Sequence, residues 1–377
     1  MNIKTEFSKR GEEPELLRFL NTAFGYDPEK NEFLDLLPKL YREEYDPCQH
    51  NLTIRGNGKI VAAAGVYPTS LQVLGEPLSC VGIGNVAVDA SVRGKGLMTA
   101  LMREVMAFVL RSGFDLAVLG GQRQRYETFG FYLGGCEHEF VFKAANLKHA
   151  FGDRPCSLCA RQLEEGDAAI GEVIALHDAQ PYRALRQPKR FPDILRSWKY
   201  APYTLWKGHD FAGYFLRKGN DVRELLLRDP NDFGDAICAM KGDADLTVAL
   251  HPYERELLLR AAAFSETETL TQWEKFCVLR WMPVLSAALR LHAATTPLDN
   301  GIFTVRIGAE PPVTLSVNGG VASVRLAKAG ESPELTLDRA QAMAFFFGRE
   351  SAHRAFLPSP TRWWFPFPLA LRMADHV

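Results

Sequence analysis

Residues 85–102 read NVAVDASVRGKGLMTALM, and this stretch carries most of the information on the fold. An apolar strand ends at Val88, and a helix with a regular apolar face begins at Leu97. The loop between them holds two glycines, which let the backbone approach a ligand closely, and two basic residues. The first N–H groups and the dipole of the helix favour an anion there, so the loop predicts a pyrophosphate-binding site. The expected ligand-binding residues are Val86, Ala87, Val88, Arg93, Gly94, Lys95, Gly96, Leu97, Met98 and Thr99.

Two well-known phosphate loops do not fit this stretch. A P-loop needs a Gly-Lys-Ser/Thr sequence after four intervening residues, whereas Lys95 is followed by a glycine. A dinucleotide-binding loop needs a third glycine and an acidic residue about 20 positions further on, and both are missing. A basic surface turn before a helix is the structural alternative, which the buried strand ahead of the loop disfavours.

The elements around the loop predict an α/β domain, in which a mixed sheet carries helices on both faces. Two helices come first, a meander of antiparallel strands follows, and strands then alternate with helices. This order fills about the first 150 residues, the size of one domain. The expected helices are 16–24, 33–45, 97–110 and 126–129, and the expected strands are 51–54, 60–67, 70–74, 78–81, 82–88, 116–119 and 139–143.

Two loop-like stretches divide the rest of the chain, at residues 151–155 and 295–301. They predict domains at 1–150, 151–295 and 296–377. In the last domain Asn318-Gly319-Gly320 predicts a hairpin, and Asp338 is the expected N-cap of a helix. The tail at 365–369 is aromatic and apolar, so we expect it to dock on the protein.

Composition excludes several classes of function. The 377 residues include 44 basic and 45 acidic side chains, so a net charge of -1 gives no general attraction for nucleic acid. No apolar stretch approaches the roughly 20 residues that span a membrane, and the polar start carries no secretory signal. Seven scattered cysteines favour a cytoplasmic location over a disulfide framework. We interpret Cys156 and Cys159 as unrelated, and the spacing of histidines and cysteines predicts no metal site.

The stretch VAVDASVRGKGLMTAL resembles the acetyl-CoA signature of the GNAT acetyltransferases, R/Q-x-x-G-x-G/A, in which Arg93 and Gly96 match. Met98 stands where glycine or alanine is usual, and this variant is similar to the branch called enhanced intracellular survival proteins. A second segment, YETFGF at 126–131, resembles that branch's Y-x-x-F-G-F/Y sequence. The resemblance implies an N-terminal GNAT fold, a degenerate GNAT-like second domain and a sterol-carrier-protein-like C-terminal domain. It also implies a homo-oligomer in the form of a closed ring, such as a hexamer.

The resemblance assigns catalytic roles to two residues far apart in the sequence. It makes Tyr126 the general acid, and a phenol of pKa about 10 can protonate a leaving thiolate whose thiol has a pKa of about 8.5. It places the terminal carboxylate of Val377 in the active site, as a base or as a group that orients a cationic amine. A free backbone N–H at 86–88 would bind the thioester carbonyl. The structural alternative for Tyr126 is a ring packed beside Phe129 and Phe131.

The leading prediction is therefore an acetyl-CoA-dependent N-acetyltransferase, with acetyl-CoA as cosubstrate and no metal. Its expected partner is a small cationic molecule with a primary amine, aminoglycoside-like or polyamine, or a lysine side chain. The alternatives are an acyl-CoA- or lipid-binding module without turnover, and a structural assembly protein, which Arg93 and Lys95 disfavour. Trp363–Phe365 could line an aromatic acceptor pocket or belong to a core. The acidic residues expected near the mouth of that pocket are Asp27, Glu29, Glu32 and Asp35.

Overall fold

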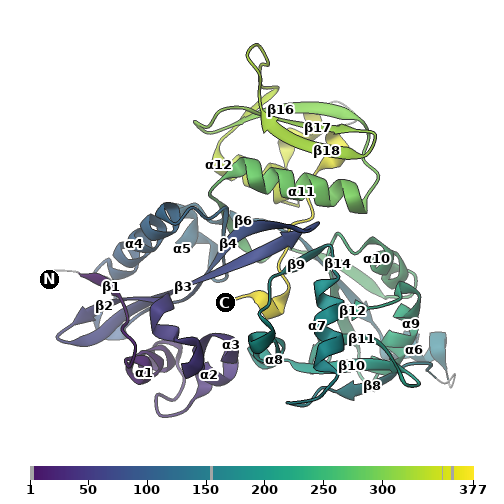
Figure 1. Ribbon diagram of the computed structural model, residues 1–377, viewed down its shortest axis with the longest axis horizontal. Helices are drawn as coiled ribbons and strands as arrows, with labels where there is room; N and C mark the ends of the chain where they lie inside the picture. The colour runs from purple at the N-terminus through teal and green to yellow at the C-terminus, as the bar shows by residue number, and fades with distance from the viewer. Residues whose placement is uncertain (1–3, 153–155, 350, 358–360) are drawn as a thin grey trace.

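The computed structural model describes residues 4–152, 156–349, 351–357 and 361–377. Within these residues the strands form three sheets, of eight, seven and four strands. Figure 1 shows the sheets as three lobes, with the C-terminus of the chain between the first two. The mixed α/β architecture expected from the sequence is confirmed.

The first sheet follows the order β1-β2-β3-β4-β5-β15-β6, and β9 pairs with β3. Its neighbours are antiparallel except for β4 and β5, which run parallel. Two of its strands come from beyond residue 150, so the N-terminal segment alone does not complete it. The strands are β1 (Thr5–Phe7), β2 (Asn51–Gly56), β3 (Lys59–Val73), β4 (Glu76–Val88), β5 (Leu116–Leu119), β6 (Tyr132–Leu133), β9 (Tyr182–Ala184) and β15 (Lys275–Val278).

Helices cover both faces of this sheet. Helix α4 (Leu97–Arg111) packs one apolar stripe on β2 to β5, because its buried residues recur at helical spacing. The opposite face carries α1 (Glu13–Phe24), α2 (Glu32–Leu36) and α3 (Pro38–Tyr41), followed by the 3₁₀ turns η1 (Glu43–Tyr45) and η2 (Pro47–His50). The single helix expected at 33–45 is wrong. Pro38 drives Leu37 out of helical geometry, to φ -135 and ψ 61, and splits it.

The second sheet follows the order β14-β7-β13-β12-β11-β10-β8. The strand expected to close the first sheet is β7, and it instead pairs with β13 and β14. Its place beside β5 is taken by β15, since an alternating strand pattern does not specify its partner. The strands are β7 (Glu137–Phe142), β8 (Cys159–Gln162), β10 (Ala201–Lys207), β11 (Asp210–Lys218), β12 (Asp221–Leu227), β13 (Leu246–Leu250) and β14 (Thr267–Thr271). The helices around it are α6 (Ala144–Phe151), α7 (Ile170–Asp178), α8 (Phe191–Arg196), α9 (Phe233–Met240) and α10 (Arg255–Ala262).

This lobe contains a disulfide bond that the sequence did not predict. Cys156 forms a disulfide with Cys238 on α9, while Cys159 is free and exposed. Cys156 and Cys159 are therefore unrelated, as predicted, and Cys156 is bonded to a cysteine that is distant in the sequence.

The third sheet follows the order β18-β17-β16-β19 and packs on α11 (Trp281–Thr295) and α12 (Arg339–Phe347). The hairpin at 318–320 and the Asp338 cap are confirmed, the latter as a capping box with Gln341. Phe365 and Phe367 are buried among aromatic rings of this core, so the apolar tail docks as expected. None of the helices in the described residues combines the length and hydropathy of a membrane span. The strands are β16 (Gly301–Ile307), β17 (Val313–Asn318), β18 (Val321–Leu326) and β19 (Leu335–Leu337).

Candidate active site

Strand β4 parts from β5 halfway along its length. The two strands pair from Cys80 with Leu116 to Ile83 with Leu119, and β4 then continues alone on that side to Val88. On its other side β4 carries one extra residue opposite β3, since Gly65 pairs with Gly84 but Ala63 pairs with Ala87. Such a bulge bends a strand and turns backbone groups away from the ladder. The sheet therefore opens at residues 84–88, where the sequence predicts a free N–H.

A buried polar network fixes this bulge. Asn85 has a φ of +43, in the left-handed region, and its Nδ2 donates to Oδ1 of Asn51 at 2.7 Å. The Tyr67 hydroxyl donates to Oδ1 of Asn85 at 3.1 Å and lies 2.9 Å from the Tyr41 hydroxyl. A Cβ at Gly65 would lie 2.2 Å from Oδ1 of Asn85, so only glycine leaves room for this side chain. These residues form no motif in the sequence, because they lie on α3, β2, β3 and β4.

A cavity of about 410 Å³ lies at the start of α4, and we call it the loop cavity. Gly94 and Gly96 hold φ values of +78 and +75, and a Cβ at either would meet no heavy atom within 4 Å. The backbone is therefore open toward a ligand at the end of α4 where N–H groups have no helical partner. Of the residues predicted to bind the ligand, those that line the cavity are Val86, Ala87, Val88, Arg93, Gly94, Gly96, Leu97 and Met98.

The loop cavity also departs from the expected set. Lys95 and Thr99 are exposed and are not among its lining residues. Ala23 and Phe24 reach it from the end of α1, and Arg125 reaches it from α5 (Arg123–Tyr126). No sequence motif indicates these three residues, and in the structure Phe24 is an apolar side chain left 46% exposed.

Tyr126 ends α5, shortly after β5, and its ring is buried in the core under α4. A Cβ at Gly121 would lie 3.1 Å from the ring, so the Gly120-Gly121 turn lets the ring approach the backbone. Burial raises the pKa of the Tyr126 phenol, which keeps it protonated at neutral pH. No hydrogen bond to its hydroxyl occurs within the described residues. The ring is thus packed as the structural alternative requires, and Tyr126 is not among the residues that line the loop cavity, although its neighbour Arg125 is.

The C-terminus lies against β4, where the strand begins to open. A Cβ at Gly82 would lie 2.5 Å from Cγ2 of Val377, and a Cβ at Gly84 would lie 3.0 Å from its carboxyl carbon. Glycine at these positions therefore makes the space that the last residue fills. Because Gly84 and Val86 are two residues apart on β4, about 7 Å at the rise of a strand, the terminal carboxyl group lies near the loop cavity.

Side chains from two lobes hold the last residues in place. Nζ of the buried Lys39 donates to the carbonyl oxygens of Ala374 and His376, and Nε1 of Trp198 donates to the latter at 3.2 Å. Burial lowers the pKa of Lys39 to about 7. The tail is thus bound through its backbone immediately before Val377.

A buried ion cluster adds to this anchor. The Arg186 guanidinium donates to Asp375 at 2.8 and 2.9 Å and to Glu224 at 2.9 and 2.7 Å. Although burial acts in the opposite direction, Arg186 holds the pKa of both carboxyls below their usual values. One guanidinium faces two carboxylates, and the nearby positive charges of Arg372 and Lys39 help to offset the second.

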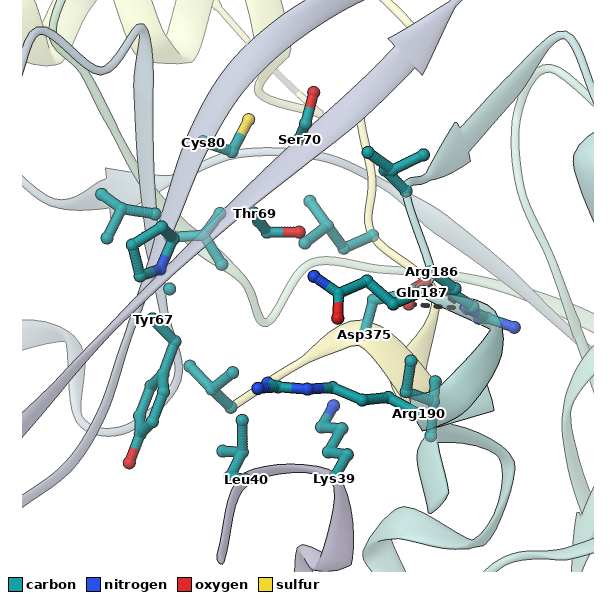
Figure 2. Close-up of a pocket in the computed structure, with 18 of the residues that line it drawn as sticks. Lys39, Leu40, Tyr67, Thr69, Ser70, Cys80, Arg186, Gln187, Arg190 and Asp375 are labelled. Carbon is teal, nitrogen blue, oxygen red and sulfur yellow. Dashed lines mark hydrogen bonds and ion pairs between the residues drawn. The ribbon is translucent and has the colours of Figure 1, made fainter. Parts of the chain in front are cut away.

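Above the terminus lies a second cavity of about 330 Å³, which we call the tail cavity. Figure 2 shows Thr69 and Ser70 on β3 at one side, Lys39 and Leu40 on α3 below, and Gln187 and Arg190 reaching in from the second lobe. Asp375 and Val377 complete the lining. The two cavities therefore contact the same strand, β4, on either side of Gly84.

The other expected acceptor residues do not line the tail cavity. Glu29 pairs with Arg18 at 3.5 Å, Glu32 pairs with Lys199 at 3.8 Å, and Asp27 and Asp35 are exposed. Trp364 and Phe365 belong to the third core, and Trp363 is 69% exposed. The acidic mouth is therefore wrong for this cavity, because those carboxylates lie on a solvated loop and helix. Among the described residues no group of three or more histidine, cysteine, aspartate or glutamate residues is arranged to hold a metal.

In a comparison with known families, residues 5–134 match the model of the acetyltransferase (GNAT) domain. No curated protein sequence matches the chain. A GCN5-related N-acetyltransferase from Kribbella flavida is similar over 100% of both chains, at 17% identity and a TM-score of 0.69. A GCN5-related N-acetyltransferase from Anabaena variabilis matches 91% of this chain and 89% of its own, at 15% identity and 0.62. Eis1 from Mycobacterium abscessus matches 90% and 88%, at 14% identity and 0.60. These likenesses show that the whole chain shares their fold.

Proposed function

Taking residues 5–134 as an acetyltransferase (GNAT) domain, we propose that the chain transfers an acetyl group from acetyl-CoA to a primary amine. The observation that carries this proposal is that the loop cavity and the tail cavity contact β4 on either side of Gly84, where the sheet opens and the terminal carboxylate lies. One cavity suits a cosubstrate and the other an acceptor.

The loop cavity fits the pantetheine and pyrophosphate of acetyl-CoA. The open backbone at Gly94 and Gly96 and the first N–H groups of α4 would bind the phosphates, with Arg93 beside them. The unpaired edge of β4 at 86–88 would lie along the pantetheine arm and donate an N–H to the thioester carbonyl. Acetyl-CoA supplies the activated acetyl group.

Tyr126 and Val377 would each carry out one of the two proton transfers. The amine nitrogen forms a bond to the acetyl carbon as the carbon–sulfur bond breaks. Tyr126, kept protonated by burial, would donate its proton to the leaving thiolate. The Val377 carboxylate would orient the amine and accept its proton, or pass it to water, because a carboxylate of pKa about 3.5 is a weak base. Lys39 and Arg186 act by positioning that carboxylate.

The resemblance extends the proposal to the other domains and to assembly. We assign residues 1–150 to the catalytic domain, 151–295 to a degenerate GNAT-like domain and 296–377 to a sterol-carrier-protein-like domain. The aromatic rings that fill the third core oppose a lipid-carrying role for that last domain. Its role here is to deliver the tail to the active site. A closed ring of identical chains, such as a hexamer, completes this proposal.

The test is release of CoA thiol from acetyl-CoA against a panel of primary amines, using protein tagged only at the N-terminus. A second form carries three extra residues after Val377, and a third carries Tyr126→Phe. We expect turnover by the native form, and a loss of at least about a hundredfold in kcat in the extended form, since the terminus fills a site that only Gly82 and Gly84 make possible.

The controls separate the parts of the proposal. Acetyl-CoA should bind all three forms with similar affinity, because neither change touches the loop cavity. Equal turnover by the native and extended forms would remove the terminus from the mechanism. Tight binding of acetyl-CoA with no thiol release from any amine would favour the module without turnover.

A further inference from the structure

The charges of the tail cavity point to the acceptor, and this inference rests on the proposed transfer. The cavity is lined by three lysine or arginine side chains, Lys39, Arg186 and Arg190, and by two carboxylates, those of Asp375 and Val377. Which of these charges remain free for a ligand decides what the cavity selects.

Two of the cations are already engaged. Arg186 makes paired hydrogen bonds to both Asp375 and Glu224, and its side chain is 1% exposed. Nζ of Lys39 is bound by two backbone carbonyls of the tail. Both side chains therefore serve the tail and have little capacity left for a ligand.

Arg190 differs from them. Its guanidinium lies 4.3 Å from the centre of the Tyr45 ring, and no hydrogen bond or ion pair joins its side chain to another residue in the described parts of the chain. The nearest acidic residue in sequence, Asp193, is engaged by Arg42 at 2.7 Å and by the Tyr45 hydroxyl at 2.7 Å. Figure 2 shows the Arg190 side chain stretched across the cavity, between Lys39 below and Gln187 above.

Among the described residues none forms an ion pair with Arg190, although the carboxylates of Asp375 and Val377 line the same cavity. His50 lines the same cavity, and its pKa is lowered by burial and then by the positive charge of Arg190. A second cationic group on an acceptor would therefore meet Arg190 and the Lys39 ammonium, whereas an oxyanion would meet a planar guanidinium fixed by stacking. Stacked arginine is suited to bidentate binding of carboxylate or phosphate.

We propose that the acceptor is a small primary amine that also carries an oxyanion, a carboxylate or a phosphate, bound by Arg190, while its amine reaches the carboxylate of Val377. The apolar side chains of Leu40, Val81 and Ile194 line the space for the carbon skeleton between the two groups. A cavity of about 150 Å³ holds benzene, so one of 330 Å³ holds a molecule of roughly a dozen non-hydrogen atoms. An amino acid or an aminoalkyl phosphate has this size and charge pattern.

The transfer itself balances without any further reactant. The ammonium first loses one proton to water, assisted by the Val377 carboxylate. The neutral nitrogen then forms the amide bond as the thioester carbon–sulfur bond breaks, and its second proton balances the one that Tyr126 gives to the thiolate. The oxyanion is unchanged, and the acceptor passes from a zwitterion to an anion. The product thus loses its attraction to the Val377 carboxylate, which favours its release.

The experiment uses the full chain with a native terminus and matched acceptors of equal length: an ω-amino carboxylate, an ω-aminoalkyl phosphate, the amide of the carboxylate, and a diamine. We expect kcat/KM to be at least tenfold higher for one or both oxyanions than for the amide, and lowest for the diamine. The order of the carboxylate and the phosphate identifies the source of the oxyanion. Arg190→Gln should lower kcat/KM for the preferred oxyanion by about tenfold to a hundredfold, mainly through KM, and change that of the amide less than threefold.

Two further variants make the result specific. Arg190→Lys should recover part of the lost kcat/KM, and Lys189→Gln, which removes an adjacent exposed charge outside the cavity, should leave every acceptor unchanged. Equal use of the amide and the oxyanions by the native protein, or an equal loss for all acceptors in Arg190→Gln, would overturn the inference and leave the transferase proposal intact. The absence of thiol release with every amine would overturn the proposed transfer itself, and the inference with it.

Discussion

The loop cavity is lined mainly by one continuous stretch, residues 86–98, whereas the tail cavity takes its lining from residues as far apart as Lys39 and Val377. The first is made of backbone: glycines with positive φ and the start of a helix. The second is made of side chains, with charged groups that cross between lobes. A site of the first kind survives changes elsewhere in the chain, and a site of the second kind depends on how the lobes pack.

The largest expected effect is on the side-chain anchor of the tail cavity. Arg186→Met would leave the carboxylates of Glu224 and Asp375 buried without the guanidinium that pairs with both, and we expect unfolding in urea to show a loss of about 3–5 kcal/mol. The matched control is Lys143→Met, which breaks an exposed pair with Asp245 and should cost less than about 1 kcal/mol. Similar losses of stability in the two variants would mean that the buried ion cluster stabilises the fold no more than an exposed ion pair does.

The next effect is a dependence of stability on pH that belongs to the tail cavity. Burial lowers the pKa of Lys39 from 10.5 to about 7, so between these values the unfolded chain binds more protons than the folded one. The free energy of unfolding of the native protein, relative to Lys39→Met, should therefore rise with pH across this window, by up to about 1.4 kcal/mol per unit. Urea unfolding at about pH 7 and 9 measures it. If the difference in unfolding free energy between the native protein and Lys39→Met stays constant or falls with pH, the pKa of Lys39 is not lowered by burial.

The smallest expected effect concerns the backbone of the loop cavity. Gly96 and Gly113 flank α4 and share a φ of +75, so alanine at either should cost about 1–2 kcal/mol of stability. Only Gly96 lines the loop cavity, so Gly96→Ala alone should weaken acetyl-CoA binding, by about threefold to tenfold. Titration calorimetry with both variants checks this. Equal affinities would show that the backbone at residue 96 does not contact the cosubstrate.

Features that depend on neighbouring residues could be predicted from the sequence, and most features that depend on distant residues could not. The strand, the glycine loop and helix α4 were predicted because each depends on neighbours within a few residues. The hairpin at 318–320 and the Asp338 cap are local in the same sense. The partner of β7, the disulfide of Cys156 and the split at Pro38 were missed. The first two are contacts over long sequence separations, and the third is a local proline effect that the apolar pattern hid.

The charges of the tail cavity could not be predicted from the sequence. The sequence directed attention to the acidic run at 27–35, whereas the cavity is charged by Lys39, Arg186 and Arg190, which no common pattern connects. By itself the sequence determined a GNAT-like loop, its helix and a tail that must dock, because backbone geometry and apolar periodicity are encoded locally. Only the tertiary structure decided that Val377 rests on Gly82 and Gly84 and that Arg190 is left without an ion-pair partner among the described residues. Those facts depend on distances between segments, and charge compensation in a folded protein is settled in space rather than along the chain.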